Sequence, residues 1–152
     1  MLTRRRIRVR ASRRSSAPVQ RVFRLLANSR SYPEWSRISA CEIERPGSVG
    51  LHNVGEVRRF RTGRLTVREQ IEDVVQDRIV KYRLLDGLPL VDYHAVTMLE
   101  PLPPGGCWIV WSCTFVPKYP GTGWFWRLFM SAVLHGFVRD LAAAAEHGQR
   151  SG

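Results

Sequence analysis

The alternation of hydrophobic and polar residues changes period along the chain, and each period predicts a different kind of element. Residues 6–12 alternate, with Ile7 and Val9 set between arginines, which predicts a first strand with one face in water. From residue 40 to residue 116 the period is again two, and turn residues divide this part into further segments. We expect strands over residues 41–45, 54–61, 65–75, 79–85, 90–99 and 107–116. Their short connections predict an antiparallel meander.

Helical periodicity occurs between the first two strands and again after the last strand. Residues 16–29 predict a helix that Ser16 could cap and whose first turn suits Pro18. Its apolar face is formed by Val19, Val22, Phe23 and Leu26. The segment "SYPEW" at 31–35 predicts a second short helical turn, with aromatic residues that pack against the first helix. A long helix over 123–146 carries an apolar stripe formed by Trp126, Met130, Val133, Phe137 and Leu141.

This order of elements predicts an α+β fold with one domain over residues 1–147 and a frayed tail over 148–152. The long helix needs a surface on which to bury its stripe, and the meander offers one curved face. We therefore expect an antiparallel sheet of about seven strands that wraps around the last helix. The two short helices would close one end.

The predicted turns set the register of the sheet. A turn at 62–63 would pair Phe60 with Leu65, Arg58 with Val67 and Val54 with Ile71. A turn at 76–77 would place Tyr82 opposite Ile71 and Leu84 opposite Glu69. A turn at 86–87 would bring Val91, Tyr93 and Ala95 to the same face. The shared face is mostly apolar and comprises Val54, Phe60, Leu65, Val67, Ile71, Val80, Tyr82, Leu84, Tyr93, Trp111 and Phe115.

Two charged residues interrupt this apolar face. Arg58 and Glu69 become diagonal neighbours in the predicted register, close enough for their side chains to meet. One interpretation is a polar anchor inside an apolar pocket. The other is an ion pair at the rim that closes one end of the cavity. Tyr82, Tyr93 and Trp111 combine an apolar body with a polar tip, which suits either a ligand cavity or an ordinary core.

Charge changes the picture at the N-terminus. The net charge is +11, and ten arginines precede the first acidic residue, Glu34. The chain has 22 Arg but only 2 Lys, so codon bias alone could explain part of this excess. Arg6, Arg8 and Arg10 are either the solvated face of a strand or a contact with an anionic membrane surface. No nucleic-acid-reading motif accompanies them, so we do not expect nucleic-acid binding.

Several classes of site are disfavoured by the residue pattern. The histidines are scattered without metal-ligand spacing, and "PGTGW" lacks the Lys-Ser/Thr of a phosphate-binding loop, so we expect neither metal nor cofactor. Cys41, Cys107 and Cys113 lack the spacing of a disulfide or metal framework and are expected to be reduced. No apolar run approaches the ~20 residues of a membrane span, and the arginine-rich start does not resemble a secretory signal. The cytoplasm is the expected location.

The element order, together with "SYPEWS", "GEVRRFRTGRLTVREQI", "YRLLDGLPLVDYHA" and the closing "PGTGW…LAAAAE", resembles the SRPBCC superfamily. Within it the chain looks most like polyketide cyclase/dehydrase-like bacterial proteins, which are relatives of START domains. The resemblance extends over residues 5–147. It implies a helix-grip fold whose cavity, between sheet and long helix, takes hydrophobic ligands.

With the resemblance, the shared face and the helix stripe become candidate cavity residues. These are Arg58, Phe60, Val67, Glu69, Ile71, Tyr82, Leu84, Tyr93, Trp111, Phe115, Trp126, Met130, Val133 and Phe137. The expected function is binding of a lipid, a polyketide or a quinone-like molecule. The alternative is a polyketide aromatase/cyclase in which Arg58, Glu69, Tyr82 or Tyr93 orients a poly-β-keto chain and moves protons.

Overall fold

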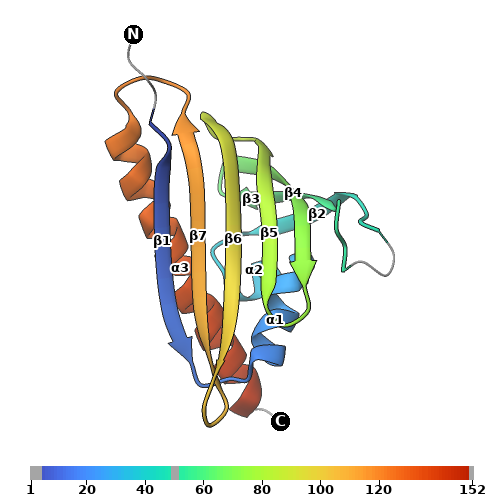
Figure 1. Cartoon of the computed structure of the whole chain (residues 1–152). Helices are drawn as coiled ribbons and strands as arrows, with labels where there is room; N and C mark the ends of the chain where they lie inside the picture. Colours follow the sequence, from blue (N-terminus) through green and yellow to red (C-terminus); the bar gives the residue numbers. More distant parts are fainter. Residues whose placement is uncertain (1–4, 49–51, 151–152) are drawn as a thin grey trace.

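The computed structural model describes residues 5–48 and 52–150. Its elements are β1 (Ile7–Ser15), α1 (Val19–Ala27), the 3-10 helix η1 (Ser29–Ser31), α2 (Tyr32–Trp35), β2 (Ala40–Arg45), β3 (Val57–Thr62), β4 (Leu65–Val75), β5 (Ile79–Asp86), β6 (Leu90–Leu102), β7 (Gly106–Pro117) and α3 (Gly123–Arg150). The strands form one antiparallel sheet in the order β1-β7-β6-β5-β4-β3-β2 (Figure 1).

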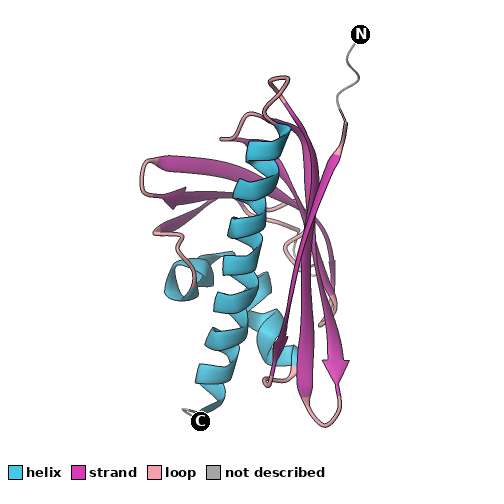
Figure 2. Ribbon diagram, turned by 90° about the vertical axis from the view of Figure 1, so that its left-hand side faces the viewer, coloured by secondary structure: helices cyan, strands magenta, loops and turns pink. Residues whose placement is uncertain are grey.

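The helix α3 runs along the inner side of this curved sheet. Figure 2 shows strands on both sides of α3, with the two short helices beside its C-terminal half. This is the predicted helix-grip arrangement, in which the sheet wraps around the last helix and α1 and α2 close one end. The predicted tail over 148–152 overlaps α3, which continues to Arg150, and residues 1–4 and 151–152 of the predicted ranges lie outside the described part.

Alternation along β7, and along β1 from Ile7 to Ala11, builds the centre of the core. Every second side chain of β7 from Cys107 to Pro117 is buried, because successive side chains of a strand point to opposite faces and one face is turned to the core. β1 pairs with it antiparallel, with Ile7 opposite Phe115. Ile7 and Val9 point inward, whereas Arg8 and Arg10 are exposed, as predicted from the sequence.

The core-facing line of α3 shares only Met130 and Leu141 with the predicted stripe. The buried side chains are Met130, Leu134, Val138, Leu141, Ala142 and Ala145, which face β1 and β7. Trp126, Val133 and Phe137 are only partly buried beside this line. The prediction favoured the large side chains of α3. The side chains that are buried against the sheet are mostly smaller aliphatic ones. By length and composition α3 could cross a membrane; about 33% of its most apolar stretch is buried in the domain, and the helix contacts β1 and β7.

The β3–β4 hairpin differs from the predicted register by two residues. The turn is Gly63-Arg64, with Gly63 in the left-handed region (φ 59°) that this tight turn favours. Phe60 is therefore opposite Val67, and Arg58 is directly opposite Glu69 rather than diagonal to it. A shift of two keeps the same side chains on the same face, so the predicted face survives the error.

Two further hairpins depart from simple turns. Between β4 and β5 the predicted pairs Ile71–Tyr82 and Glu69–Leu84 are confirmed, although a register shift between Ile71 and Asp73 compensates for a longer turn. In β6 the pairing is irregular between Val91 and His94, and Asp92 adopts a φ of 52°. The side chains at the start of this strand therefore point to the opposite face from the one predicted. Val91 is consequently 45% exposed, so its predicted inward position is wrong.

Two predicted boundaries also fail for local reasons. Val54 belongs to a turn and not to β3, because His52, Asn53 and Gly55 all have positive φ and end the extended conformation. Ser16 does not cap α1: the N-cap is Pro18, without a side-chain hydrogen bond. The backbone N–H of Ser16 instead donates to the Glu146 carboxylate at 2.9 Å.

The contacts of α3 predict how strongly the domain depends on its core-facing line. Leu134→Ala removes a fully buried side chain and should lower the free energy of unfolding by about 2–5 kcal/mol, measured by urea denaturation. Leu128→Ala is the matched control on the same helix, because Leu128 is 64% exposed. Equal losses in the two variants would contradict the packing described here.

Candidate functional site

A cavity of about 580 Å³ lies between the sheet, α2 and α3, where the sequence predicts the main cavity. The sheet contributes polar and apolar side chains: Arg58, Phe60, Thr62, Leu65, Val67, Glu69, Tyr82, Leu84, Tyr93 and Trp111. The helix α3 contributes Phe129, Met130, Ala132, Val133, His135, Gly136, Phe137, Arg139 and Asp140. Tyr32, Arg37, Ile38 and Leu88 complete the lining from the connecting segments.

Most candidate residues from the sequence border this cavity, and three do not: Ile71, Phe115 and Trp126. Phe115 stacks on Tyr93 with 6.0 Å between ring centroids, so Tyr93 covers it from the cavity. Trp126 packs against Phe129 instead, at 5.4 Å. Ile71 is fully buried in β4, two residues beyond Glu69, and does not reach the cavity.

Arg58 is the central polar residue of the cavity and is fully buried. Its Nε donates a hydrogen bond to Glu69 Oε1 at 3.1 Å, and its Nη2 lies 3.1 Å from the same oxygen. Burial opposes the guanidinium charge, but Tyr32 and Glu69 outweigh that effect and raise the pKa of Arg58. The pair is thus inside the cavity wall, which favours the polar-anchor interpretation over a rim ion pair.

Three aromatic rings surround the guanidinium. The Arg58 Cζ atom is 5.0 Å from the Tyr32 ring centroid, 4.7 Å from that of Phe60 and 4.9 Å from that of Tyr82. Ring faces attract a cation, and this attraction is stronger where water is excluded. The rings therefore compensate part of the hydration that Arg58 loses on burial.

A chain of buried hydrogen bonds extends behind Arg58. Its Nη1 donates to Ser29 Oγ at 3.1 Å, and Ser29 Oγ donates to Glu56 Oε2 at 2.6 Å. Asn53 Nδ2 donates to the same carboxylate at 3.2 Å. Arg58 thus connects two buried carboxylates, Glu69 directly and Glu56 through Ser29, so its charge is neutralised from both sides.

One polar group of this cluster lacks a complete partner. Within the described residues, Arg58 Nη2 is fully buried and makes no hydrogen bond of good geometry, despite its ionic contact with Glu69. Buried N–H groups without an acceptor are rare in folded proteins because they lose their water without compensation. Arg58 lines the cavity, so an acceptor on a ligand that reaches the guanidinium would complete this set of partners.

Burial shifts the pKa values of other titratable groups of the cavity. Burial raises the pKa of Glu69, although the guanidinium of Arg58 acts in the opposite direction. Burial also raises the pKa of Tyr82 and of Tyr93 well above the usual value. Both hydroxyls therefore stay protonated at neutral pH, and the Tyr82 hydroxyl accepts a hydrogen bond from Trp111 Nε1 at 3.1 Å.

Sequence reasoning missed the part of the site that comes from η1, α2 and the turn before β3. The aromatic residues of "SYPEW" were expected only to pack against the first helix. Instead Tyr32 stacks on Phe60 at 4.9 Å and borders the cavity. Neither Ser29 nor Glu56 stands out in the sequence, because the hydrogen bonds that join them to Arg58 depend on the tertiary fold. The one local signal was the pair of aromatics around Pro33.

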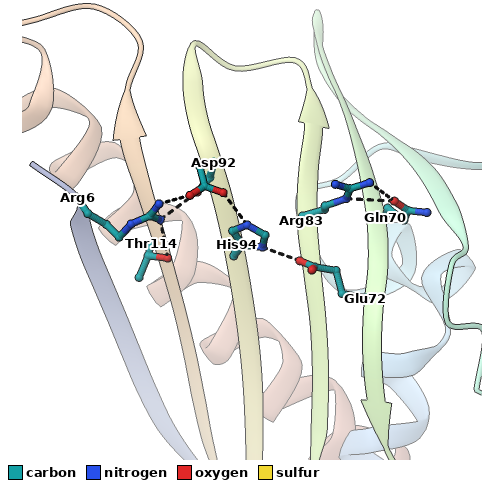
Figure 3. Close-up of polar contacts among 7 residues, drawn as sticks. All are labelled: Arg6, Gln70, Glu72, Arg83, Asp92, His94 and Thr114. Carbon is teal, nitrogen blue, oxygen red and sulfur yellow. Dashed lines mark hydrogen bonds and ion pairs between the residues drawn. The ribbon is translucent and has the colours of Figure 1, made fainter. Parts of the chain in front are cut away.

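A second polar cluster lies on the outer face of the sheet, away from the cavity (Figure 3). His94 contacts Glu72 through Nδ1 at 2.6 Å and Asp92 through Nε2 at 2.8 Å. Asp92 also forms an ion pair with Arg6, which in turn donates to Thr114 Oγ1 at 3.3 Å. The cluster joins β4, β6 and β7 to the start of β1 through exposed side chains, so its role is cross-strand support.

The comparisons with known proteins agree with this architecture. The family model described as "Polyketide cyclase / dehydrase and lipid transport" matches residues 6–146. A START superfamily protein from Mycobacterium smegmatis superposes with a TM-score of 0.80 at 14% identity, covering 92% of this chain and 97% of that one. The Zhui aromatase/cyclase from a Streptomyces species gives 0.76 at 18% identity, covering 93% and 94%. A Thermobifida fusca protein gives 0.75 at 22%, covering 94% and 93%. No curated protein sequence matches significantly.

The buried pair predicts a pH-dependent effect of removing Arg58. Arg58→Met leaves Glu69 buried without its cation, and the free energy of unfolding should fall by about 3–5 kcal/mol at neutral pH. The variant raises the folded-state pKa of Glu69 further above the unfolded value of 4.5, so stability is present below that pH and is lost as the pH rises through the folded pKa.

The measurement is urea unfolding of parent and variant near pH 4.5 and near neutrality. The control is the double variant Arg58→Met with Glu69→Gln, in which the pH dependence of the difference should shrink, because the contribution of Glu69 is removed. An equal loss at both pH values would show that Glu69 does not carry a buried charge.

The outer cluster predicts a smaller effect on stability, which comes from a charged imidazole and not from a buried carboxylate. The contact with Glu72 raises the pKa of His94 above 6.5, so its contribution to stability is present below pH 6.5 and is lost as pH rises through the raised pKa. His94→Asn should therefore lower the free energy of unfolding by less than about 1 kcal/mol at acid pH, because the site is exposed. The difference between parent and variant should shrink at alkaline pH and in high salt. A difference independent of pH would contradict a charged His94.

Proposed function

The chain belongs to the polyketide cyclase/dehydrase and lipid transport family, and from this premise we propose that it binds one amphipathic small molecule in the cavity beneath α3. The observation that carries the proposal is Arg58, which borders an otherwise mostly apolar cavity and whose buried Nη2 makes no hydrogen bond of good geometry within the described residues. A lipid, a polyketide or a quinone-like molecule supplies both an apolar body and such an acceptor.

The size and lining of the cavity support a ligand of this kind. A volume of about 580 Å³ falls in the range of sites for small molecules, about 300–1,000 Å³. Phe60, Val67 and Leu84 on the sheet face Met130 and Phe137 on the helix across it. An apolar body would bury its surface between these layers, and the driving force is the removal of that surface from water.

The polar end of the ligand would lie against Arg58. A ketone or carboxylate oxygen there would accept a hydrogen bond from the guanidinium, whose Nη2 makes none of good geometry within residues 5–48 and 52–150. Glu69 already balances the guanidinium charge, so a neutral carbonyl is accepted as well as an anion. A cationic group would be excluded, since it would face Arg58 in a water-poor space.

The second candidate is an aromatase/cyclase reaction on a poly-β-keto chain. It is favoured by the presence, in one cavity, of a carboxyl group with a raised pKa, Glu69, next to a fixed guanidinium and the Tyr82 hydroxyl. Arg58 would hold a ketone oxygen while Glu69, Tyr82 or Tyr93 moves a proton. Conversion of a poly-β-ketone analogue to a cyclic product would establish the enzyme, and tight binding without conversion supports the carrier.

We also propose a reducing, cytoplasmic location. Cys41, Cys107 and Cys113 are unpaired, and the last two are buried. Unpaired cysteines are usual where the surroundings keep thiols reduced. In such a compartment burial also protects them, because it raises the pKa of Cys107 and of Cys113 to about 11 and so disfavours the reactive thiolate.

The proposed anchor predicts a ranking of matched probes. Dansyl-labelled undecanoic acid and its methyl ester should bind about tenfold more tightly than the amine of the same chain length, because only the first two accept a hydrogen bond from Arg58. Fluorescence titration measures the dissociation constants. Glu69→Gln should strengthen binding of the acid selectively, since it removes the negative charge beside the guanidinium.

Tyr93→Phe is the companion variant, because it removes one hydroxyl at the cavity wall and keeps the ring that stacks on Phe115. Its affinity should change more than its thermal stability. Equal affinities for acid, ester and amine in the parent would contradict the anchor at Arg58. Variants that lose several kcal/mol of stability, with affinity changing in parallel, would make the residues structural.

A further inference from the structure

Large apolar side chains are exposed together at the start of α3. Trp124 is 68% exposed, Leu128 64% and Phe125 46%, and Tyr119 in the preceding turn is 55% exposed. Trp124 and Leu128 are one helical turn apart and share a face, with Phe125 beside them. We call these residues, Tyr119, Trp124, Phe125 and Leu128, the aromatic end. Single exposed apolar residues are ordinary, but a contiguous group marks an interaction surface.

The aromatic end lies at the same end of the molecule as the start of β1. Figure 1 shows the first turn of α3 and the beginning of β1 together at the top of the view. A Cβ atom built on Gly123 would be 3.1 Å from the Ile7 side chain, so the two segments are in direct contact. The exposed arginines that begin the chain, Arg5 and Arg6, are therefore close to this end.

The charged residues of the sequence segment that carries the aromatic end are all cationic. Lys118 lies 5.7 Å from the Tyr119 ring, and Arg127 is exposed within the first turns of α3. No acidic residue occurs in the sequence between Glu100 and Asp140. Asp92, on the neighbouring outer face, is already engaged by Arg6 and His94. Aromatic side chains bordered by cations match the interface of a bilayer that contains anionic lipids.

We propose that the aromatic end docks on the surface of an anionic phospholipid bilayer, with Trp124, Phe125 and Leu128 inserted at headgroup depth. Lys118 and Arg127 then contact lipid phosphates. A second copy of the chain fits this surface less well, because a two-fold contact would bring the same cations of both copies together, and the segment between Glu100 and Asp140 has no acid to pair them.

The docking surface is continuous with the cavity. Phe125 stacks on Phe129 with ring centroids 6.1 Å apart, and Phe129 borders the cavity. A hydrophobic ligand could thus pass between bilayer and cavity along apolar side chains. This last step rests on the proposed ligand binding, whereas docking itself does not, and the two can fail separately.

The test is flotation with vesicles of equal parts phosphatidylglycerol and phosphatidylcholine, compared with vesicles of phosphatidylcholine alone. Trp124→Ser combined with Leu128→Ser should weaken partitioning to the anionic vesicles by about tenfold or more, because both apolar contacts are lost. Both side chains are exposed, so the thermal unfolding temperature should not fall. Raising the salt concentration should weaken binding of the parent protein.

The matched control is Arg8→Gln combined with Arg10→Gln, which removes cations from the outer face of β1 and leaves the aromatic end intact. If the aromatic end docks, this variant keeps most of its vesicle binding. The opposite result is that the glutamine variant loses vesicle binding and the serine variant keeps it. Docking would then occur through Arg8 and Arg10, and the proposal would be overturned. Equal partitioning of parent and serine variant would also overturn it. So would a parent dimer that the serine variant turns into a monomer in sedimentation experiments.

Discussion

The ion pair between Arg58 and Glu69 is the constraint on which the interior of this domain depends. Both groups are removed from water, and a charge in that position is unfavourable unless its partners are arranged closely around it. The hairpin between β3 and β4 places the two residues directly opposite each other. The surrounding residues then supply aromatic rings and hydrogen bonds to the same guanidinium.

This requirement explains the chain segment between β1 and β2. Ser29 and Tyr32 come from the short helices that close the end of the sheet, and both contact Arg58. The closing helices are therefore part of the polar cluster and not only a cover for the core. Their position in turn sets the end wall of the cavity, so the burial of one arginine and the shape of the ligand space are linked.

The sequence predicts the architecture well because it follows from periodicity. The strands, the long helix and the inward face of β7 all follow from spacings of two or about 3.6 residues. It predicts the site less well because the site depends on departures from regularity. The turn at Gly63-Arg64 moved Arg58 from diagonal to opposite Glu69, and the irregularity at Asp92 moved Val91 outward. Such changes depend on single backbone angles. The hydrogen bonds from Ser29 to Glu56 join residues without any shared pattern.

The pairing of β1 with β7 has a consequence for the synthesis of the protein. Ile7 and Phe115 are neighbours in the sheet, although more than one hundred residues separate them in sequence. On the ribosome, β1 leaves the exit tunnel long before β7 exists, and the helix α3 that covers both is made after β7. Ile7, Val9 and Ala11 consequently have no native surface on which to bury themselves during most of translation. The arginines that alternate with them keep β1 soluble before β7 is made, and they discourage its pairing with other chains.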